Sequence, residues 1–215
     1  MFQLNDVWYE YTRENGQVQT ILQGVTLELG AGGVTCVVGP SGSGKSSLLR
    51  LLNRLADPTR GAIAFREKPL VDWNPLELRR RVALVPQTPV MLPGTVQDNL
   101  EAGLRLRNQQ LHDPAAWLDR MGLPAGLLTK NARDLSGGEK QRLALARTLV
   151  TKPEVLLLDE VTSSLDPAST ALVEGLVAGL GLPVVWISHD MEQVRRVADL
   201  VLRLEAGQVR EAVLA

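Results

Sequence analysis

The residues whose types and spacing most clearly indicate a chemical function are the eight from Gly39 to Ser46, which read GPSGSGKS. They follow an apolar run, residues 34–38, and precede residues 47–52, whose leucines have helical spacing. Glycines let a backbone curl so that its N–H groups converge on an anion, and a helix N-terminus adds about half a positive charge. In such a loop Lys45 reaches the β- and γ-phosphates, and the Ser46 hydroxyl ligates Mg²⁺. The pattern therefore predicts a nucleoside triphosphate site rather than an ordinary Gly/Ser turn.

Two adjacent carboxylates follow a second apolar run, residues 155–158, which is typical of a parallel strand buried on both faces. Ligands of α/β sheets bind where parallel strands end, so Asp159 suits a Mg²⁺ shell and Glu160 suits a base that orients or deprotonates water. The alternative is a pair of solvated loop acids. A further run, residues 183–187, ends at His189. His189 should share this sheet edge with Glu160, which favours a ligand role over that of a surface histidine.

A third motif, LSGGE, occupies residues 135–139. Ser136 and Glu139 have capping-box spacing, which explains both residues without any ligand. Gly137 and Gly138 then fall in the first helical turn, where each costs about 1 kcal/mol relative to alanine. This cost suggests a backbone that another group must approach closely.

The elements that position these groups alternate between strands and helices. Strands are predicted over the ranges 2–7, 25–29, 61–65, 82–85, 201–204 and 208–213. A polar hairpin over residues 13–17 carries an Asn-Gly pair that favours a tight turn. Asn74-Pro75 caps and opens a helix. The fold class that results is α/β with a parallel-sheet core.

Residues 88–135 interrupt this alternation with a helical insertion. A loop over residues 88–94 comes first, and Thr95 opens a helix. Residues up to about 131 look helical, with breaks at residues 113–114 and 123–126. Met91 and Leu92 in the loop are expected to be partly exposed because Pro89 and Pro93 keep the segment extended. The alternative is that both pack under the insertion.

Aromatic residues Trp8, Tyr9 and Tyr11 precede the phosphate loop. One of them, Tyr11, is a candidate to stack on adenine, and the alternative is that all three cover the sheet. His112 lies in a polar break and is interpreted as a surface residue.

The composition excludes several classes of function. The formal net charge of −1 gives no broad basic surface for nucleic acid. Cys36 is the single cysteine, so no disulfide can form within the chain, which fits a reducing compartment. Neither a signal peptide nor an apolar run of about 20 residues is visible, so we expect a protein without its own membrane span.

In this order the motifs resemble the ATP-binding subunit of ABC transporters over nearly the whole chain. Residues 39–46 are similar to the Walker A loop, residues 135–139 to the signature sequence and residues 155–160 to Walker B. Gln87 is similar to the Q-loop glutamine, residues 163–166 to the D-loop and His189 to the switch histidine. Val161 departs from the family, which usually has proline there, and Ser47 stands where threonine is usual.

The resemblance implies roles for individual residues. Glu160, His189, Gln87 and Lys45 would be catalytic, and Mg²⁺ would be held by Ser46, Gln87 and Asp159. The residues that would bind ATP are Tyr11, Gly39, Ser41, Gly42, Gly44, Lys45, Ser46, Ser47, Ser136, Gly137, Gly138 and Asp166. Asp166 belongs to the D-loop, and Ser136, Gly137 and Gly138 would contact the ATP held by a second copy.

The resemblance also implies an architecture and partners. It implies a P-loop NTPase (RecA-like) parallel-sheet core with an antiparallel β subdomain, within a single domain spanning residues 1–215. Residues 1–87 and 136–215 would form the catalytic core and residues 88–135 a helical subdomain that docks an integral membrane permease. The chain would form an ATP-dependent homodimer at the cytoplasmic face of the inner membrane, without nucleic acid.

The resemblance indicates the reaction more clearly than it indicates the transported substrate. Residues 86–89, 94–100 and 128–142 are similar to bacterial ATPases proposed to export iron or other metals. Phosphate or other small-solute import is the nearest alternative. A soluble ABC ATPase that acts on DNA or ribosomes is a rival from another class, although such proteins usually carry two cassettes or a long coiled coil.

Overall fold

The computed structural model describes residues 1–12, 15–30 and 32–214, with the backbone alone over residues 211–214. Residues 13 and 14 of the predicted hairpin turn lie outside the described residues. The chain forms two compact units. The first contains Met1–Leu84, Glu154–Asp159 and Gly181–Ala215, and the second contains Val85–Pro153 and Glu160–Leu180. The second unit includes the predicted helical segment 88–135 and extends beyond it.

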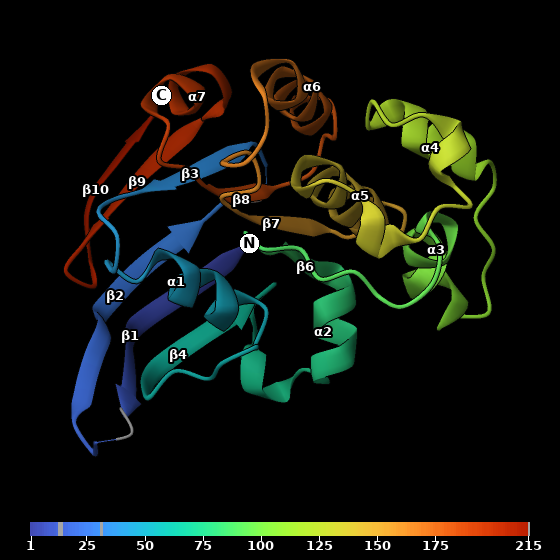
Figure 1. Ribbon diagram of the computed structural model, residues 1–215. Helices are drawn as coiled ribbons and strands as arrows, with labels where there is room; N and C mark the ends of the chain where they lie inside the picture. The colour runs from blue at the N-terminus through green and yellow to red at the C-terminus, as the bar shows by residue number, and fades with distance from the viewer. Residues whose placement is uncertain (13–14, 31, 215) are drawn as a thin grey trace. The chain divides into compact units, whose positions relative to one another are not determined.

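The first unit contains a six-stranded sheet with the strand order β10-β9-β3-β8-β7-β6 (Figure 1). Its strands are β3 (Val34–Val38), β6 (Val82–Val85), β7 (Val155–Asp159), β8 (Val184–Ile187), β9 (Leu200–Glu205) and β10 (Gln208–Leu214). Strands β9, β3, β8 and β7 run parallel, and β10 pairs antiparallel with β9. Every residue of β3 and β8 is buried, as the continuous apolar runs predict.

A second sheet in this unit has the order β2-β1-β4-β5 and antiparallel pairing. Its strands are β1 (Phe2–Thr12), β2 (Val18–Leu29), β4 (Arg60–Phe65) and β5 (Lys68–Pro69). Both β1 and β2 are longer than predicted, because register shifts let the pairing continue past Val7. The aromatic residues Trp8, Tyr9 and Tyr11 therefore lie within a strand.

Helices bury the faces of the sheets in the first unit. Helix α1 (Lys45–Leu52) lies on one side of the six-stranded sheet and α7 (Met191–Val197) on the other (Figure 1). The leucines of α1 join residues of both sheets in one core. Helix α2 (Pro75–Arg81) begins at Asn74, whose side chain accepts hydrogen bonds from two backbone amides, as predicted. A 3₁₀ turn, Leu70–Asp72, precedes it.

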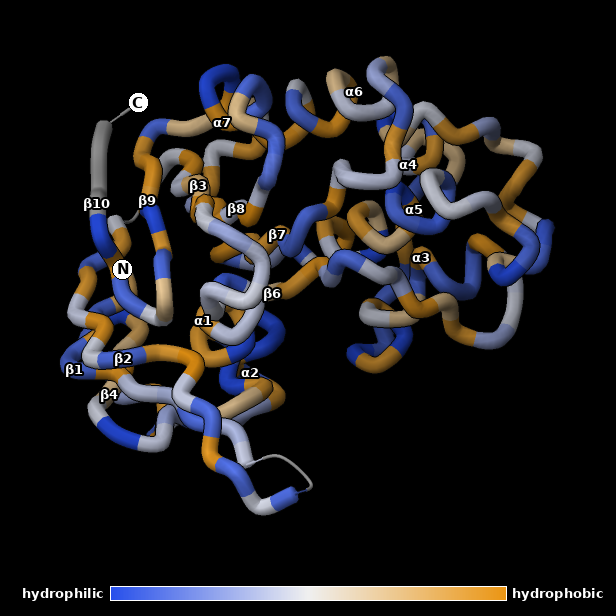
Figure 2. The backbone as a smooth tube through the Cα atoms, turned by 60° about the vertical axis from the view of Figure 1, so that its left-hand side comes forward, coloured by the Kyte–Doolittle hydropathy of each residue, from blue (hydrophilic) through white to orange (hydrophobic). Residues whose placement is uncertain are grey.

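The second unit is helical. It contains α3 (Val96–Arg105), α4 (Pro114–Arg120), α5 (Gly137–Leu149) and α6 (Pro167–Ala178), with 3₁₀ turns at Ala125–Leu127 and Ala132–Asp134. Helix α3 packs against α5. In the tube view, apolar residues recur along both helices (Figure 2). Residues 107–112, 121–122 and 128–131 are less helical than predicted, and positive φ angles at Asn108 and Gly122 interrupt the first two of these ranges.

The expectation for the loop over residues 88–94 is wrong at Met91 and holds at Leu92. Met91 is 9% exposed, whereas Val90 is 69% and Leu92 43% exposed. Successive side chains of an extended segment point to opposite sides, so Met91 enters the core of the second unit while its two neighbours face outward. Among the described residues, no helix is both long and apolar enough to span a membrane.

Candidate functional site

The phosphate loop joins β3 to α1 in the first unit, and its glycines are required by the surrounding chain. Gly39 has φ 145°, and a Cβ atom there would lie 2.0 Å from the backbone oxygen of Leu204. Gly44 caps α1 with φ 104°, and its Cβ atom would lie 2.9 Å from the carbonyl oxygen of Ile21. A side chain at either position would displace backbone. Neighbouring strands therefore fix the path of this loop.

Lys45 begins α1 and is only 5% exposed. Its Nζ donates hydrogen bonds to the carbonyl oxygens of Gly39, at 2.8 Å, and Pro40, at 2.9 Å. The ammonium group is thus held against the loop that the sequence predicts to surround phosphate. The next residue, Ser46, donates from Oγ to Oδ1 of Asp159 at 3.1 Å. The structure brings together the two oxygen groups predicted to share a metal ion.

Ser43 was missed by the sequence analysis. Its hydroxyl is buried and has no hydrogen-bond partner among the described residues. A buried hydroxyl without a partner is uncommon and calls for an explanation. Its place inside a glycine-rich loop was the only sequence signal. The neighbouring predicted residues differ: Ser41 and Gly42 are exposed, and Ser47 is partly buried.

His189 follows β8, the strand that lies between β3 and β7. It is exposed and lines a cavity of about 490 Å³ together with Gly39, Pro40 and Ser188. The Ser188 hydroxyl donates to Oε1 of Gln193 at 2.8 Å, which anchors the turn that carries the imidazole. Within the first unit, the fold therefore places His189 beside the phosphate loop.

Glu160 and Gln87 meet in the second unit. Nε2 of Gln87 donates to Oε2 of Glu160 at 2.7 Å. Glu160 has φ 50°, and its carbonyl oxygen accepts hydrogen bonds from the amide and the hydroxyl of Ser163. The next residue, Val161, is buried, so an apolar side chain fills the position where proline was expected. The predicted metal ligand Gln87 thus contacts the predicted base in this structure.

The signature sequence forms the N-terminus of α5. The capping box is present: the Ser136 amide donates to Oε2 of Glu139 at 2.8 Å, and the Glu139 amide to Oγ of Ser136 at 3.4 Å. Hydrogen bonding of the Glu139 carboxylate to Ser136, first to its backbone amide and then to its side chain, lowers the pKa of Glu139. A Cβ atom on Gly138 would lie 3.2 Å from the Leu165 side chain, whereas one on Gly137 would meet nothing within 4 Å. The chain's own packing accounts in part for Gly138 but not for Gly137.

Asp166 has a structural role that the sequence analysis did not predict. It caps α6: Oδ1 accepts from the Ser169 amide at 2.9 Å and Oδ2 from the Ser169 hydroxyl at 2.7 Å. The side-chain and backbone hydrogen bonds of Ser169 lower the pKa of Asp166. Its contact with nucleotide stays a prediction.

The three aromatic residues of β1 differ in their surroundings. Tyr9 is partly buried and packs against the core. Trp8 donates from Nε1 to Asp6, and Arg60 lies 5.7 Å from its ring centroid. Tyr11 is 52% exposed. Of the three, Tyr11 keeps the ring surface that a stacking role requires. His112 is exposed, as predicted.

Comparison with known proteins agrees with this arrangement. Residues 22–163 match the family model described as "ABC transporter". The chain is 40% identical to the "Probable iron export ATP-binding protein FetA" of Escherichia coli, over 89% of this chain and 88% of that protein. It is also 40% identical to the "Methionine import ATP-binding protein MetN" of Xanthomonas campestris pv. campestris, over 98% of this chain and 66% of that protein.

The solved ATP-binding cassette MJ0796, a dimer in a post-hydrolysis state bound to ADP and Pi, superposes with a TM-score of 0.87. It is 26% identical, and the match covers 100% of this chain and 98% of that one. The predicted α/β fold of a P-loop NTPase is therefore confirmed. The chain belongs to the ABC transporter family: it is an ATP-binding subunit and has the fold of the family's ATPases.

Proposed function

We propose that this chain binds Mg²⁺–ATP at the loop over residues 39–46 and hydrolyses it to power transport through a separate membrane permease. The observation that carries the proposal is the arrangement at the start of α1. There the buried Lys45 ammonium is held by loop carbonyls, and Ser46 is hydrogen-bonded to Asp159. A triphosphate would take over the Lys45 hydrogen bonds, with the backbone amides of the loop as further donors.

The residues present fit a magnesium ion that arrives with its nucleotide. No cluster of three or more His, Cys, Asp or Glu occurs over the described parts of the chain. Mg²⁺ usually binds proteins through one or two oxygen ligands and takes the rest from phosphate and water. Ser46 Oγ and Asp159 Oδ1 are such ligands, and Gln87 is a further candidate. The bound ion would neutralise the charge that develops on the phosphates.

The hydrolytic roles follow from the chemistry of each side chain. Glu160 would orient and polarise the attacking water, as a carboxylate at the end of a buried strand is suited to do. Gln87 would leave its contact with Glu160 to reach the water and the metal ion. His189 would hold the γ-phosphate from the turn after β8. Tyr11 would stack on the adenine ring.

A homodimer would complete each site. The named cassette relative was solved as a dimer. Ser136, Gly137 and Gly138 of one copy would face the ATP bound by the other, with the α5 N-terminus directed at the γ-phosphate. The open space beside Gly137 supports this, because no contact within the described chain demands glycine there.

The permease would dock at the exposed apolar side chains Val90 and Leu92. Since relatives are named for iron export and for methionine import, metal export is one proposal for the cargo and small-solute import is its competitor. ATP-driven work without a permease is the remaining alternative. The formal net charge of −1, without a basic excess, makes it the weakest.

The test is to purify the chain with its membrane partner and measure phosphate release from ATP. Iron, other metals, methionine and inorganic phosphate are then added in turn. We expect hydrolysis to require Mg²⁺, to stop with EDTA and to rise with one cargo class. The matched control is Glu160→Gln, which should bind ATP and hydrolyse it very slowly. Hydrolysis at an unchanged rate in that variant would refute the assignment of the base.

A further inference from the structure

The segment from residue 86 to residue 92, here called the tethered segment, is attached to α5 at two points within the second unit. At one end, Nε2 of Gln141 donates to the carbonyl oxygen of Pro86 at 3.1 Å. Near the other end, Nη2 of Arg147 donates to the carbonyl oxygen of Val90 at 2.9 Å. Six residues of helix, about 9 Å, separate the two donors. One rigid helix therefore holds both ends of this irregular segment.

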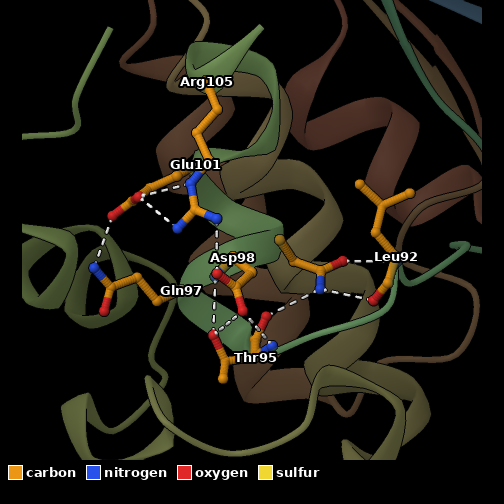
Figure 3. A network of polar contacts seen from close by, with 7 residues as sticks. Leu92, Thr95, Gln97, Asp98, Glu101 and Arg105 are labelled. Carbon is orange, nitrogen blue, oxygen red and sulfur yellow. Dashed lines mark hydrogen bonds and ion pairs between the residues drawn. The ribbon is translucent and has the colours of Figure 1, made fainter. Parts of the chain in front are cut away.

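Asn99 of α3 reinforces the second attachment. It is fully buried, and its Oδ1 accepts from the Leu92 amide at 2.8 Å and from Nη1 of Arg147 at 3.2 Å. Its Nδ2 donates to the carbonyl oxygens of Leu92 and Thr95, both at 3.0 Å. Figure 3 shows dashed hydrogen bonds that reach Leu92 and Thr95 near the start of α3. The Asn99 side chain thus bridges the backbone of Leu92 and the guanidinium group of Arg147.

Arg147 is an unusual group to find at this place. It is partly buried, burial lowers its pKa, and its hydrogen-bond partners are a carbonyl and an amide oxygen. No carboxylate among the described residues pairs with it. A partly buried cation without an anion is costly, so packing alone does not explain it. Arg105 of α3 contrasts with it, because Arg105 pairs with Asp98 and Glu101 at the surface (Figure 3).

The tethered segment carries Gln87, whose amide donates to Glu160. Because Pro86 directly precedes Gln87, the Gln141 hydrogen bond fixes the point from which the Gln87 side chain extends. We infer that Gln141 and Arg147 are positioning residues for ATP hydrolysis: they fix the tethered segment to α5 and so place Gln87 against Glu160. This inference rests on the role proposed for Glu160. The hydrogen bonds of Arg147 and Asn99 also link the exposed Val90 and Leu92 to α5, the helix that begins with the signature sequence.

The first test separates rate from binding. Arg147→Met and Gln141→Met keep an unbranched side chain of similar length and remove the donors. We expect each to lower kcat by about 10- to 100-fold, because misplacement by about 1 Å has that effect, while KM for ATP stays within about twofold. Arg105→Met is the matched control and should leave both constants unchanged. An unchanged kcat in Arg147→Met would overturn the inference.

The second test asks whether Arg147 acts through Gln87. If it does, Arg147→Met should have no further effect on kcat in a Gln87→Ala background, since coupled residues are not additive. Full additivity of the two substitutions would show that Arg147 acts elsewhere. So would a Gln87→Ala protein with wild-type kcat. This double-mutant cycle decides the inference whatever Glu160→Gln does, so its failure is distinguishable from failure of the proposed function.

Hydrogen exchange without nucleotide gives an independent measurement. Loss of the Arg147 donors should speed exchange at the Leu92 amide, whereas Thr148→Ala, which alters a hydrogen bond confined to α5, should not. If Arg147→Met does not fold, Arg147→Lys replaces it. Lysine can still reach one carbonyl, and it should give intermediate exchange and intermediate kcat. Exchange at Leu92 unchanged from wild type would contradict the tether.

Discussion

At the scale of residues, Lys45 shows how a charged side chain can be kept buried for a ligand. Its ammonium is almost fully inside and is satisfied by two carbonyl oxygens of its own loop. A phosphate carries a negative charge, so its hydrogen bond with this ammonium would be stronger than one from a neutral carbonyl. The same residue therefore organises the loop and, in the proposed function, would attract the nucleotide.

Lys45→Ala should severely weaken ATP binding or abolish turnover, because the phosphates lose this charge-assisted hydrogen bond. Nucleotide titration by calorimetry and a phosphate-release assay measure the two effects. Lys130→Ala, which removes an exposed charge from the second unit, is the control and should behave as wild type. Wild-type hydrolysis by Lys45→Ala would contradict the phosphate-loop assignment.

Cys36 lies in the middle of β3, where burial, with a smaller effect of Asp199, raises its pKa to about 12. Only the thiolate reacts readily with alkylating agents, so the folded chain should resist iodoacetamide at about pH 8. In denaturant the same thiol should be modified within minutes. Mass spectrometry before and after unfolding measures both states. Rapid modification of the native chain would show that β3 opens more easily than its burial indicates.

At the scale of elements, the loop over residues 88–94 illustrates what the sequence could not specify. The prolines indicated an extended segment, in which successive side chains point to opposite sides. They did not indicate which of these side chains face inward. The hydrogen bonds of Asn99 to the backbone of Leu92 set that alternation, and nothing in the sequence marks a contact seven residues away. Met91 is therefore buried although its neighbours are exposed.

This loop gives a matched pair of substitutions. Met91→Asp should lower the free energy of unfolding by several kcal/mol, because it buries a carboxylate in apolar surroundings. Leu92→Asp and Val90→Asp should leave the thermal melt nearly unchanged and weaken co-purification with the permease. Melts and a pull-down distinguish these effects. A Leu92→Asp protein that melts early, without a selective loss of the partner, would refute docking at this loop.

The start of α3 predicts a pH dependence. Hydrogen bonds from the backbone and the side chain of Thr95, followed by Arg105, lower the pKa of Asp98 to about 2 (Figure 3). A depressed folded-state pKa contributes stability above the unfolded value of about 3.9, and this contribution is lost as pH falls toward 2. The stability difference between wild type and Asp98→Asn should shrink over that window. Denaturant melts at several pH values measure it, and a difference independent of pH would contradict the assignment.

Much of the fold and of the candidate site follows from local sequence. Strands are identified by their apolar runs, and two helix starts by Asn74 and by the capping box at Ser136. These signals are readable because they come from residues close together in the sequence. The N-cap role of Asp166 is equally local, because its partner Ser169 lies three residues away, although the sequence analysis did not identify it. The Gln87–Glu160 contact and the buried hydroxyl of Ser43 could not be predicted in this way. Each depends on which distant segments the tertiary fold brings to one place, and residue type alone does not carry that information.

At the scale of the whole molecule, the proposed catalytic groups divide between the two units. Lys45, Asp159 and His189 belong to the first, whereas Gln87, Glu160 and the signature residues belong to the second. One of the four boundaries along the chain falls between Asp159 and Glu160, which are joined by one peptide bond. A proposed metal ligand and the proposed base are thus neighbours in sequence but members of different units.

The dimer gives the prediction that tests the complete assembly. Glu160→Gln keeps the shape of the side chain and removes its charge, so ATP should bind but remain unhydrolysed and the ATP-bound dimer should accumulate. Gel filtration coupled to light scattering should show a monomer without nucleotide and a dimer with ATP.

Adding Ser136→Arg to Glu160→Gln should abolish that shift, because a large side chain would enter the space in which the partner's γ-phosphate is proposed to lie. Ser136 is exposed, so the fold of the single chain should tolerate the change except for the loss of its capping hydrogen bond, about 1 kcal/mol. Ser136→Ala loses that same bond without the added bulk and serves as the control. Were Ser136→Ala to prevent dimers as fully as Ser136→Arg, the effect would come from loss of the Ser136 hydroxyl and not from the added bulk. Were Glu160→Gln to stay monomeric under saturating ATP, the proposal that two copies enclose the nucleotide would be refuted.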